Sequence, residues 1–381
     1  MKKKITALLC ILILALSGCE GASTQSAKCE LPDKSTITEK TLKDVFAEHG
    51  MKVGCCVHSG ITSNGNLEKI VLEEFDSITM ENAMKPDSVL NREESQREGV
   101  LTVEFSDETV RILNWAKAHE MPMRGHTLIW YSQTPEWIFH QDFDEGKALV
   151  GRDEMLLRME TFIRSVFEKL EDMGCIDLFY AYDVVNEGFM EDGTMRGNNW
   201  TQTIGEDYIW YAFYYADKYA PDSIDLYYND YNEQYKGDTL CDFVKTLVDE
   251  DGRSLIDGIG LQAHLFTADD LATYLEGVDK LASSGLKLEV TELDLGLGAY
   301  QAPAMPTQDK FKEQGQYYYE LINGLFERAD AGKISMDSVT FWGFTDSSSW
   351  RSEYYPQLYD KDLQPKYAYY GAMQIKDYAG Y

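Results

Sequence analysis

Short apolar runs alternate with longer helix-like stretches along this chain, and this alternation limits the possible folds more than any other feature. Eight runs predict buried strands, at residues 52–57, 77–80, 122–129, 179–185, 224–228, 258–263, 286–291 and 338–344. Helices are predicted at residues 108–119, 152–173, 207–219, 239–249, 268–283 and 309–331. Eight β units joined by helical connections predict an α/β protein, namely a single-domain (β/α)8 TIM barrel.

The alternative α/β architecture is an open, doubly wound sheet. Such a sheet would usually carry a glycine-rich phosphate loop after its first strand. The corresponding segment here, CCVHSG at residues 55–60, is not such a loop. The sequence also shows no internal repeat and no second linker, which favours one closed domain.

The N-terminus has the architecture of a secretory signal. Lys2, Lys3 and Lys4 form a positive start, and residues 5–16 form an apolar run that is short for a membrane span. The run ends in LSGC at residues 16–19, which resembles a bacterial lipobox, so we predict that Cys19 carries a lipid. A simple secretory signal and a short membrane anchor are the alternatives. We therefore predict a lipoprotein signal peptide at 1–18, a lipid-anchored flexible tether at 19–33 and the barrel at 34–381, held on an extracytoplasmic membrane face.

Composition limits the partners. The chain of 381 residues has a formal charge of −30, so neither nucleic acid nor an anionic membrane surface is expected to attract it. A neutral polymer fits this charge better than a strongly anionic one. Five cysteines remain beyond Cys19, an odd number, and their spacing indicates no zinc site. We expect a monomer with no metal and no cofactor.

Two glutamates each close an apolar run. Glu187 follows AYDVVN at residues 181–186, and Glu292 follows LKLEVT at residues 286–291. Both runs read as strands that stop at the glutamate, and barrel enzymes hold their active sites at the C-terminal ends of their strands. Two carboxyl groups that face one cleft suit cleavage of a glycosidic bond with retention of configuration. Either glutamate alone would be explained more simply as one of 65 acidic residues.

Further polar motifs stand at the predicted strand ends. They are TMENAMK at 79–85, RGHTLIWYSQ at 124–133, DVVNE at 183–187, YNDYN at 228–232, GLQAH at 260–264, TELD at 291–294 and FWGFTD at 341–346, followed by Trp350. Together they resemble glycoside hydrolase family 10, the endo-β-1,4-xylanases. The resemblance covers nearly the whole chain from about Lys34 onward. It implies a cofactor-free, retaining endo-β-1,4-xylanase that acts on xylan or xylo-oligosaccharides.

The resemblance also implies individual roles. Glu187 matches the acid/base of the family, and Glu292 matches the nucleophile. The supporting residues would be Asn186, Gln262, His264 and Asp294, of which His264 can bridge Asp294 and Glu292 and keep the nucleophile ionised. The residues that would contact the substrate are Glu81, Asn82, Lys85, His126, Trp130, Gln133, Tyr231, Trp342 and Trp350.

Two positions depart from the family pattern. Tyr131 stands where many members have His, and unlike His its side chain does not take up or release a proton near neutral pH. Asn198 stands where Ser is frequent. Simpler explanations exist for single residues: a surface salt bridge for Lys85, a core or metal-binding histidine for His264, and barrel-mouth packing for the tryptophans.

Two other functions stay open. The chain could be a retaining barrel glycosidase for another β-1,4-glycan such as β-glucan, or a surface lipoprotein that captures polysaccharide without cleaving it.

Overall fold

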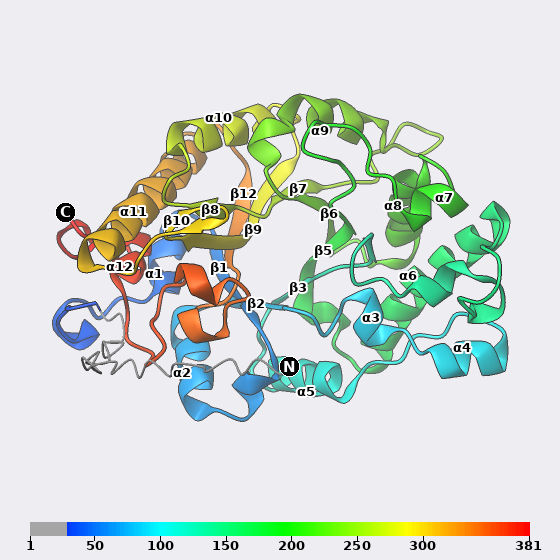
Figure 1. The fold of residues 1–381 in the computed structure, drawn as a ribbon, viewed down its shortest axis with the longest axis horizontal. Coiled ribbons are helices and arrows are strands. Elements are labelled where there is room, and N and C mark those ends of the chain that lie inside the picture. Colours follow the sequence, from blue (N-terminus) through cyan, green and yellow to red (C-terminus); the bar gives the residue numbers. More distant parts are fainter. Residues whose placement is uncertain (1–28) are drawn as a thin grey trace, which may run out of the picture.

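In residues 29–381, which the computed structural model describes, eight parallel strands form a closed ring with helices around it (Figure 1). The ring runs through β1 (Lys52–Val57), β2 (Ser77–Met80), β3 (Met123–Gly125), β5 (Phe179–Asn186), β6 (Asp225–Asp230), β7 (Gly258–Leu261), β9 (Lys287–Gly296) and β12 (Met336–Phe341). β12 pairs with both β1 and β9, which closes the ring. The predicted (β/α)8 barrel is confirmed.

Helices on the outside connect the strands. The longer ones are α2 (Gly65–Glu74), α5 (Asp107–Ala118), α6 (Arg152–Asp172), α8 (Tyr208–Tyr219), α10 (Leu271–Ala282) and α11 (Gln308–Asp330). The shorter ones are α1 (Leu42–Ala47), α3 (Pro86–Val89), α4 (Arg92–Glu98), α7 (Asn199–Thr203), α9 (Gly237–Phe243) and α12 (Tyr367–Ala372). Side-chain caps mark several starts: the side chains of Ser106, Asp270 and Thr307 accept backbone N–H groups of α5, α10 and α11.

Two predicted strands are interrupted. The run predicted at 122–129 forms β3 and a separate β4 (Ile129–Trp130), because Thr127 Oγ1 and the Leu128 N–H both donate to the carbonyl oxygen of Asp183 at 3.0 Å. The run predicted at 258–263 ends at Leu261, and β8 (His264–Phe266) begins after Ala263, whose φ is 54°. The residues at both breaks are buried, so an apolar pattern does not reveal the interruptions.

β9 is longer than predicted. The sequence places the end of this strand at Thr291, but the strand continues through Glu292 to Gly296. β8 pairs with the added residues, with His264 opposite Asp294, and so supplies backbone partners beyond the ring. The expectation that Glu292 closes a strand is therefore wrong, whereas Glu187 directly follows β5 as predicted.

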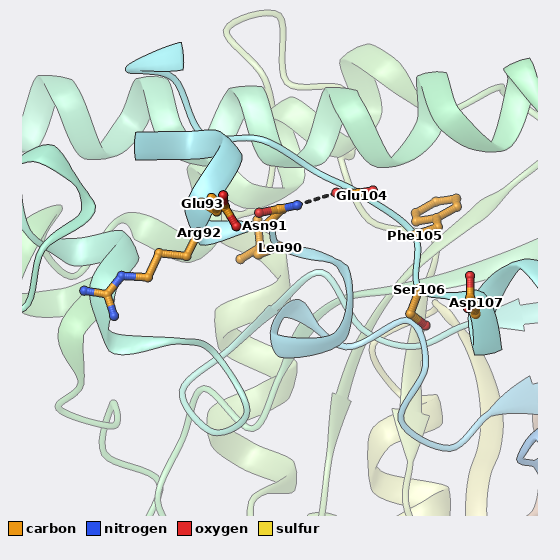
Figure 2. Close-up of a pocket in the computed structure, with 8 residues that line it drawn as sticks. All are labelled: Leu90, Asn91, Arg92, Glu93, Glu104, Phe105, Ser106 and Asp107. Carbon is orange, nitrogen blue, oxygen red and sulfur yellow. Dashed lines mark hydrogen bonds between the residues drawn. The ribbon is translucent and has the colours of Figure 1, made fainter. Parts of the chain in front are cut away.

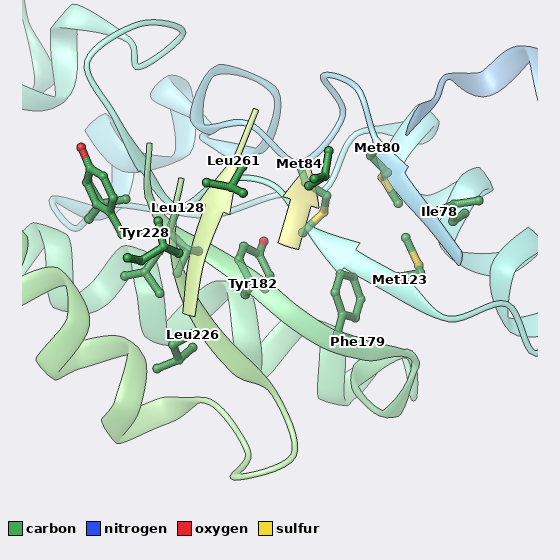
Figure 3. Packing of buried hydrophobic residues seen from close by; sticks show 14 of the residues in the cluster. Ile78, Met80, Met84, Met123, Leu128, Phe179, Tyr182, Leu226, Tyr228 and Leu261 are labelled. Carbon is green, nitrogen blue, oxygen red and sulfur yellow. The ribbon is translucent and has the colours of Figure 1, made fainter. Parts of the chain in front are cut away.

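The strands are buried on both faces, because side chains fill the ring inside and helices cover it outside. Figure 3 shows part of this packing, with Phe179 of β5 next to Met123. The rings of Phe179 and Tyr182 stack at 5.9 Å. Gly125 in β3 makes room for Tyr182, since a Cβ at this position would lie 2.2 Å from the tyrosine ring.

The first described residues lie against the barrel wall. Cys29 and Leu31 pack against a small cluster of Leu297, Phe311 and Tyr367. The last part of the segment predicted as a tether therefore contacts the domain, while the predicted signal peptide and lipidation site lie outside the described residues. Within residues 29–381, no helix combines the length and the apolar character that a membrane crossing requires.

Candidate active site

Glu187 lies at the mouth of the barrel, directly after β5. Its φ of 57° is left-handed, which is uncommon for a residue other than glycine. Its Oε1 accepts hydrogen bonds from Asn186 Nδ2 at 3.2 Å and from Gln262 Nε2 at 3.1 Å. Both donors are neutral amides, and no cation in the described residues forms an ion pair with this carboxylate within 4.0 Å.

Glu292, on β9, has very different partners. Its side chain is almost entirely buried, Oε1 accepts from Asn229 Nδ2 at 2.7 Å, and Oε2 lies 3.2 Å from His264 Nε2. His126 Nδ1 is 4.0 Å from Oε1. Burial alone would raise the pKa of Glu292, but His126, His264 and Lys85 outweigh it, so the pKa lies below its usual value. This carboxylate is held ionised.

Three side-chain amides connect the two glutamates. Asn186 Oδ1 accepts from Asn229 Nδ2 at 2.9 Å and from Gln262 Nε2 at 3.2 Å. Asn229 donates in turn to one glutamate and Gln262 to the other. The carboxyl groups therefore belong to one hydrogen-bonded set, although they come from strands far apart in the sequence.

His264 bridges two carboxylates. Its Nδ1 is 3.0 Å from Asp294 Oδ1, and its Nε2 faces Glu292. Burial opposes the charged imidazole, but the charge of Asp294 and the hydrogen bonds to both carboxylates raise the pKa of His264 to about 10. Asp294 also accepts from Trp350 Nε1 at 3.0 Å and from Arg351 Nη1 at 2.5 Å. His264 is thus a fixed cation beside Glu292.

A buried ion network lies beneath the mouth. Arg124 donates to both oxygens of Asp183, at 2.6 Å for the longer bond, and to Glu289 at 2.7 Å. His126 Nδ1 lies 2.8 Å from Asp183 Oδ2, so this carboxylate fixes which imidazole nitrogen carries the proton. Burial would raise the pKa of Asp183, but Arg124 and His126 outweigh it and the pKa is lowered. The network thus holds the imidazole of His126 within 4.0 Å of Glu292.

Lys85 organises the residues predicted for substrate contact on one side. Its ammonium donates to Asn82 Oδ1 at 3.1 Å and to Gln133 Oε1 at 3.0 Å, and it lies 4.9 Å from the centre of the Trp130 ring. Burial lowers its pKa, although Glu292 and Glu81 work against that shift. Lys85 is buried and has no ion pair within 4.0 Å in the described residues, so the alternative of a surface salt bridge is wrong.

The predicted aromatic contacts differ in exposure. Trp342 is buried and lies 5.2 Å from His126, edge to face, so packing at the mouth accounts for much of its surface. Trp350 is 58% exposed, 5.1 Å from His264, and its indole is free to meet a sugar face. Tyr231 follows β6, and its hydroxyl accepts a hydrogen bond from Arg196 Nη2 at 3.0 Å.

A separate open pocket of about 420 Å³ lies at residues 90–93 and 104–107 (Figure 2). None of the predicted site residues lines it. Among residues 29–381, no group of three or more His, Cys, Asp or Glu side chains is placed to hold a metal ion. Among the described residues, the predicted site residues therefore gather at the barrel mouth and not at this pocket.

Comparison with known proteins agrees with this arrangement. Residues 41–375 match Glycosyl hydrolase family 10. The chain belongs to this family. It is 33% identical over 322 residues to Endo-1,4-beta-xylanase B of Butyrivibrio fibrisolvens, covering 80% of this chain and 48% of that protein. It is 32% identical over 354 residues to Endo-1,4-beta-xylanase A of Caldicellulosiruptor saccharolyticus, covering 88% of this chain and 95% of that protein.

A solved structure of a family 10 protein is also similar. The structure holds two modules of endo-1,4-beta-D-xylanase 10B of Clostridium thermocellum, complexed with xylohexaose. The identity is 31% and the TM-score 0.78, with 88% of this chain and 67% of that chain covered. The chain spans about half or less of the length of several curated relatives that it matches, with shares of 48%, 35% and 32%.

Sequence reasoning missed some residues of the family 10 site. Asn229 lies in the strand-end motif YNDYN at 228–232, but nothing in that motif predicts that it donates to Glu292. The register that sets Asn229 opposite Asn186 was the signal that could have found it. Asp183 and Arg124 were missed as well, because the sequence does not show that these two charged residues, each inside an apolar strand, pair with one another.

Proposed function

We propose that this family 10 protein is a retaining endo-β-1,4-xylanase, with Glu187 as acid/base and Glu292 as nucleophile. The difference between the two carboxyl surroundings carries the proposal. Glu292 faces two histidines and an ammonium that favour its ionised form, whereas the hydrogen bonds to Glu187 Oε1 come from neutral amides and no cation pairs with this carboxyl group within 4.0 Å in the described residues. Paired carboxyl groups with contrasting surroundings take opposite acid–base roles.

The proposed reaction has two steps. Protonated Glu187 gives its proton to the glycosidic oxygen while a carboxylate oxygen of Glu292 forms a bond to the anomeric carbon, and the leaving chain departs. Glu187, now a carboxylate, takes a proton from water, whose oxygen displaces Glu292 from the same carbon. Two inversions leave the product in the β configuration. The proposal gives Asn186 a hydrogen bond to the sugar 2-hydroxyl, which would strengthen as positive charge develops on the ring.

Xylan is the proposed substrate class. Several relatives are named endo-1,4-beta-xylanases, and the solved relative holds xylohexaose. In this chain, Lys85, Asn82 and Gln133 form a connected polar group on one side of the glutamates. Such a group offers donors and acceptors to sugar hydroxyls and needs no charge on the substrate, which suits a neutral glycan.

The test is release of reducing sugar from xylan, mixed-linkage β-glucan and carboxymethylcellulose, measured side by side. We expect internal cleavage of xylan and a mixture of oligosaccharides. Faster release from β-glucan would replace the substrate assignment with the alternative β-glycanase. Binding to xylan without release of sugar would instead support the capture function.

The anchoring prediction is a separate proposal, supported by the lipobox-like sequence at residues 16–19. Cys19→Ser should abolish lipid attachment and move the protein to the soluble fraction, since Cys19 would carry the lipid. Cys29→Ser is the matched control and should leave the protein in the membrane pellet. If Cys19→Ser stays in the pellet, the lipobox interpretation is wrong.

A further inference from the structure

Arg196, in the loop between β5 and α7, lies beside Glu187 without an acidic partner. The protein has 65 acidic and 35 basic residues, yet Arg196 forms no ion pair within 4.0 Å in the described part of the chain. Its side chain donates to the carbonyl oxygens of Glu187 at 2.9 Å and Phe189 at 3.3 Å, and to the hydroxyl of Tyr231 at 3.0 Å. Because carboxylates are abundant, the lack of an ion pair at this arginine indicates that its positive charge has a role other than pairing with an acidic side chain.

Arg196 also fixes the backbone of Glu187. The left-handed φ of 57° costs energy and persists only where neighbouring contacts hold it. Arg196 supplies two of these contacts: Nε binds the carbonyl oxygen of Glu187, and the Arg196 N–H donates to the carbonyl oxygen of Gly188 at 2.8 Å. The direction of the Glu187 side chain depends on this turn.

Two aromatic rings enclose the guanidinium. It lies 4.2 Å from the centre of the Tyr131 ring and 6.0 Å from that of Tyr231. Tyr131 is 41% exposed, and its pKa is raised by burial and then by the charge of Glu187, so its phenol is neutral at physiological pH. Tyr131 is the position where this chain departs from the frequent histidine of the family. Because Tyr131 is neutral, Arg196 supplies the positive charge next to Glu187. A histidine at position 131 would add a second positive charge whenever it was protonated.

Arg196 stays positively charged across the physiological pH range. Burial works against it, but the hydrogen bond to Tyr231 and the nearby Tyr131, Tyr231 and Glu187 more than offset burial and raise its pKa. A permanent positive charge interacts weakly with a neutral carboxyl group and strongly with a carboxylate. Its effect on Glu187 therefore changes when Glu187 loses its proton.

We propose that Arg196 is a positioning residue for Glu187, which holds its left-handed turn and stabilises the carboxylate left when its proton moves to the leaving oxygen. The inference rests on the proposed function of Glu187 as acid. No new bond forms to Arg196: the proton passes from the Glu187 carboxyl to the glycosidic oxygen, and the negative charge appears beside the guanidinium. In the first step, this contribution is made only where the leaving group needs that proton.

The test compares leaving groups in Arg196→Met and Arg196→Lys. With dinitrophenyl β-xylobioside, whose leaving group needs no proton, the rate of the first step should change by about 2-fold or less. With phenyl β-xylobioside and with xylan, Arg196→Met should lose roughly 10–100-fold, the range of a hydrogen bond to a charged group. Arg196→Lys keeps the charge and should recover part of the loss. Arg253→Met, which removes a surface arginine paired with Asp217, is the control and should behave as wild type.

The outcomes separate the two proposals. If wild type does not cleave even dinitrophenyl xylobioside, the proposed function itself fails. If wild type is active and Arg196→Met loses the same factor on every leaving group, Arg196 supports the fold and does not position the acid. An unchanged rate on xylan would overturn the inference as well. Thermal unfolding of both variants checks that they fold, and Arg196→Lys gives the same comparison if Arg196→Met does not.

Discussion

Two buried glutamates near the mouth, Glu292 and Glu233, respond to burial in opposite ways. Their exposed fractions are 4% and 1%. The pKa of Glu292 is lowered, whereas burial raises the pKa of Glu233 to about 7. Glu292 accepts hydrogen bonds from Asn229 and His264, whereas neither carboxylate oxygen of Glu233 accepts a well-formed hydrogen bond in the described residues, and only its own backbone N–H and the Tyr274 hydroxyl interact weakly with it. Partners, and not depth, decide the charge of these two groups.

The nearest cation shows why Glu233 stays poorly stabilised as an anion. Lys236 Nζ lies 2.7 Å from Asp230 Oδ1 and also donates to the carbonyl oxygen of Phe189. Lys236 works to lower the pKa of Glu233, but the charge of Asp230 works to raise it. One buried ammonium thus serves two buried carboxyl groups and pairs with only one. Glu187 differs from both in its contacts, since it receives amide hydrogen bonds and no direct ion pair within 4.0 Å in the described residues.

The largest expected effect is the loss of Glu292. Glu292→Ala should lower the rate by about 10⁵-fold or more on every substrate, including activated aryl xylobiosides, because no group remains to form the covalent intermediate. Initial rates with dinitrophenyl xylobioside measure this. Labelling with a 2-fluoro xylobioside and peptide mapping should mark Glu292 alone. Proton NMR of fresh product should show the β-anomer first; early α-anomer, or a label elsewhere, would contradict both the mechanism and this assignment.

Glu187→Ala should have a smaller and more selective effect. On xylan the rate should fall by roughly 10²–10⁴-fold, the usual contribution of a general acid. Dinitrophenyl xylobioside should still be attacked rapidly, because its leaving group needs no proton, and glycosyl-enzyme should accumulate. Added azide should restore turnover and give a β-glycosyl azide. If both substrates slow equally and azide has no effect, Glu187 is not the acid/base.

His264→Gln tests the charged surroundings of Glu292. His264 helps to lower the pKa of Glu292, so its removal should raise that pKa and move the acidic limb of kcat/KM on xylobiosides to higher pH. The loss should be roughly 10–100-fold at acidic pH and smaller near neutrality, where Glu292 ionises anyway. His119→Gln, on the exposed end of α5, should leave the profile in place. An acidic limb that does not move would show that the other partners of Glu292 suffice.

The sequence predicted the barrel and the residues at its mouth because buried parallel strands are continuous apolar runs whose C-terminal ends share one edge. It did not predict the break at residues 126–128 or the extension of β9, since these residues are as buried as those of a strand. Arg196 was missed because it bonds mainly to backbone carbonyl oxygens, which leave no mark in a side-chain pattern. The structure brings the predicted site residues together; their catalytic roles remain predictions.

Glu233→Gln should have the smallest effect on activity and should change how stability depends on pH. A carboxyl group with a pKa of about 7 when folded and about 4.5 when unfolded makes the native state bind the extra proton between these values. The contribution of Glu233 to the stability of wild type should therefore fall as pH rises from about 4.5 to 7, by about 3 kcal/mol in total, and stay constant above about pH 7. Glutamine cannot ionise, so the variant should lack this decline.

The decisive quantity is the difference in unfolding free energy between Glu233→Gln and wild type, measured by denaturant titration at several pH values. Burying an amide in place of a carboxyl group adds a constant offset, which cancels when the difference at pH 8 is compared with that at pH 4.5. We expect the variant to gain between these pH values, with little change in kcat on xylan at either. Glu276→Gln, an exposed position on α10, should show no such gain. A difference that does not vary with pH would mean that the pKa of Glu233 is not raised on folding. Glu233 would then have a partner that stabilises its charge, as Glu292 does.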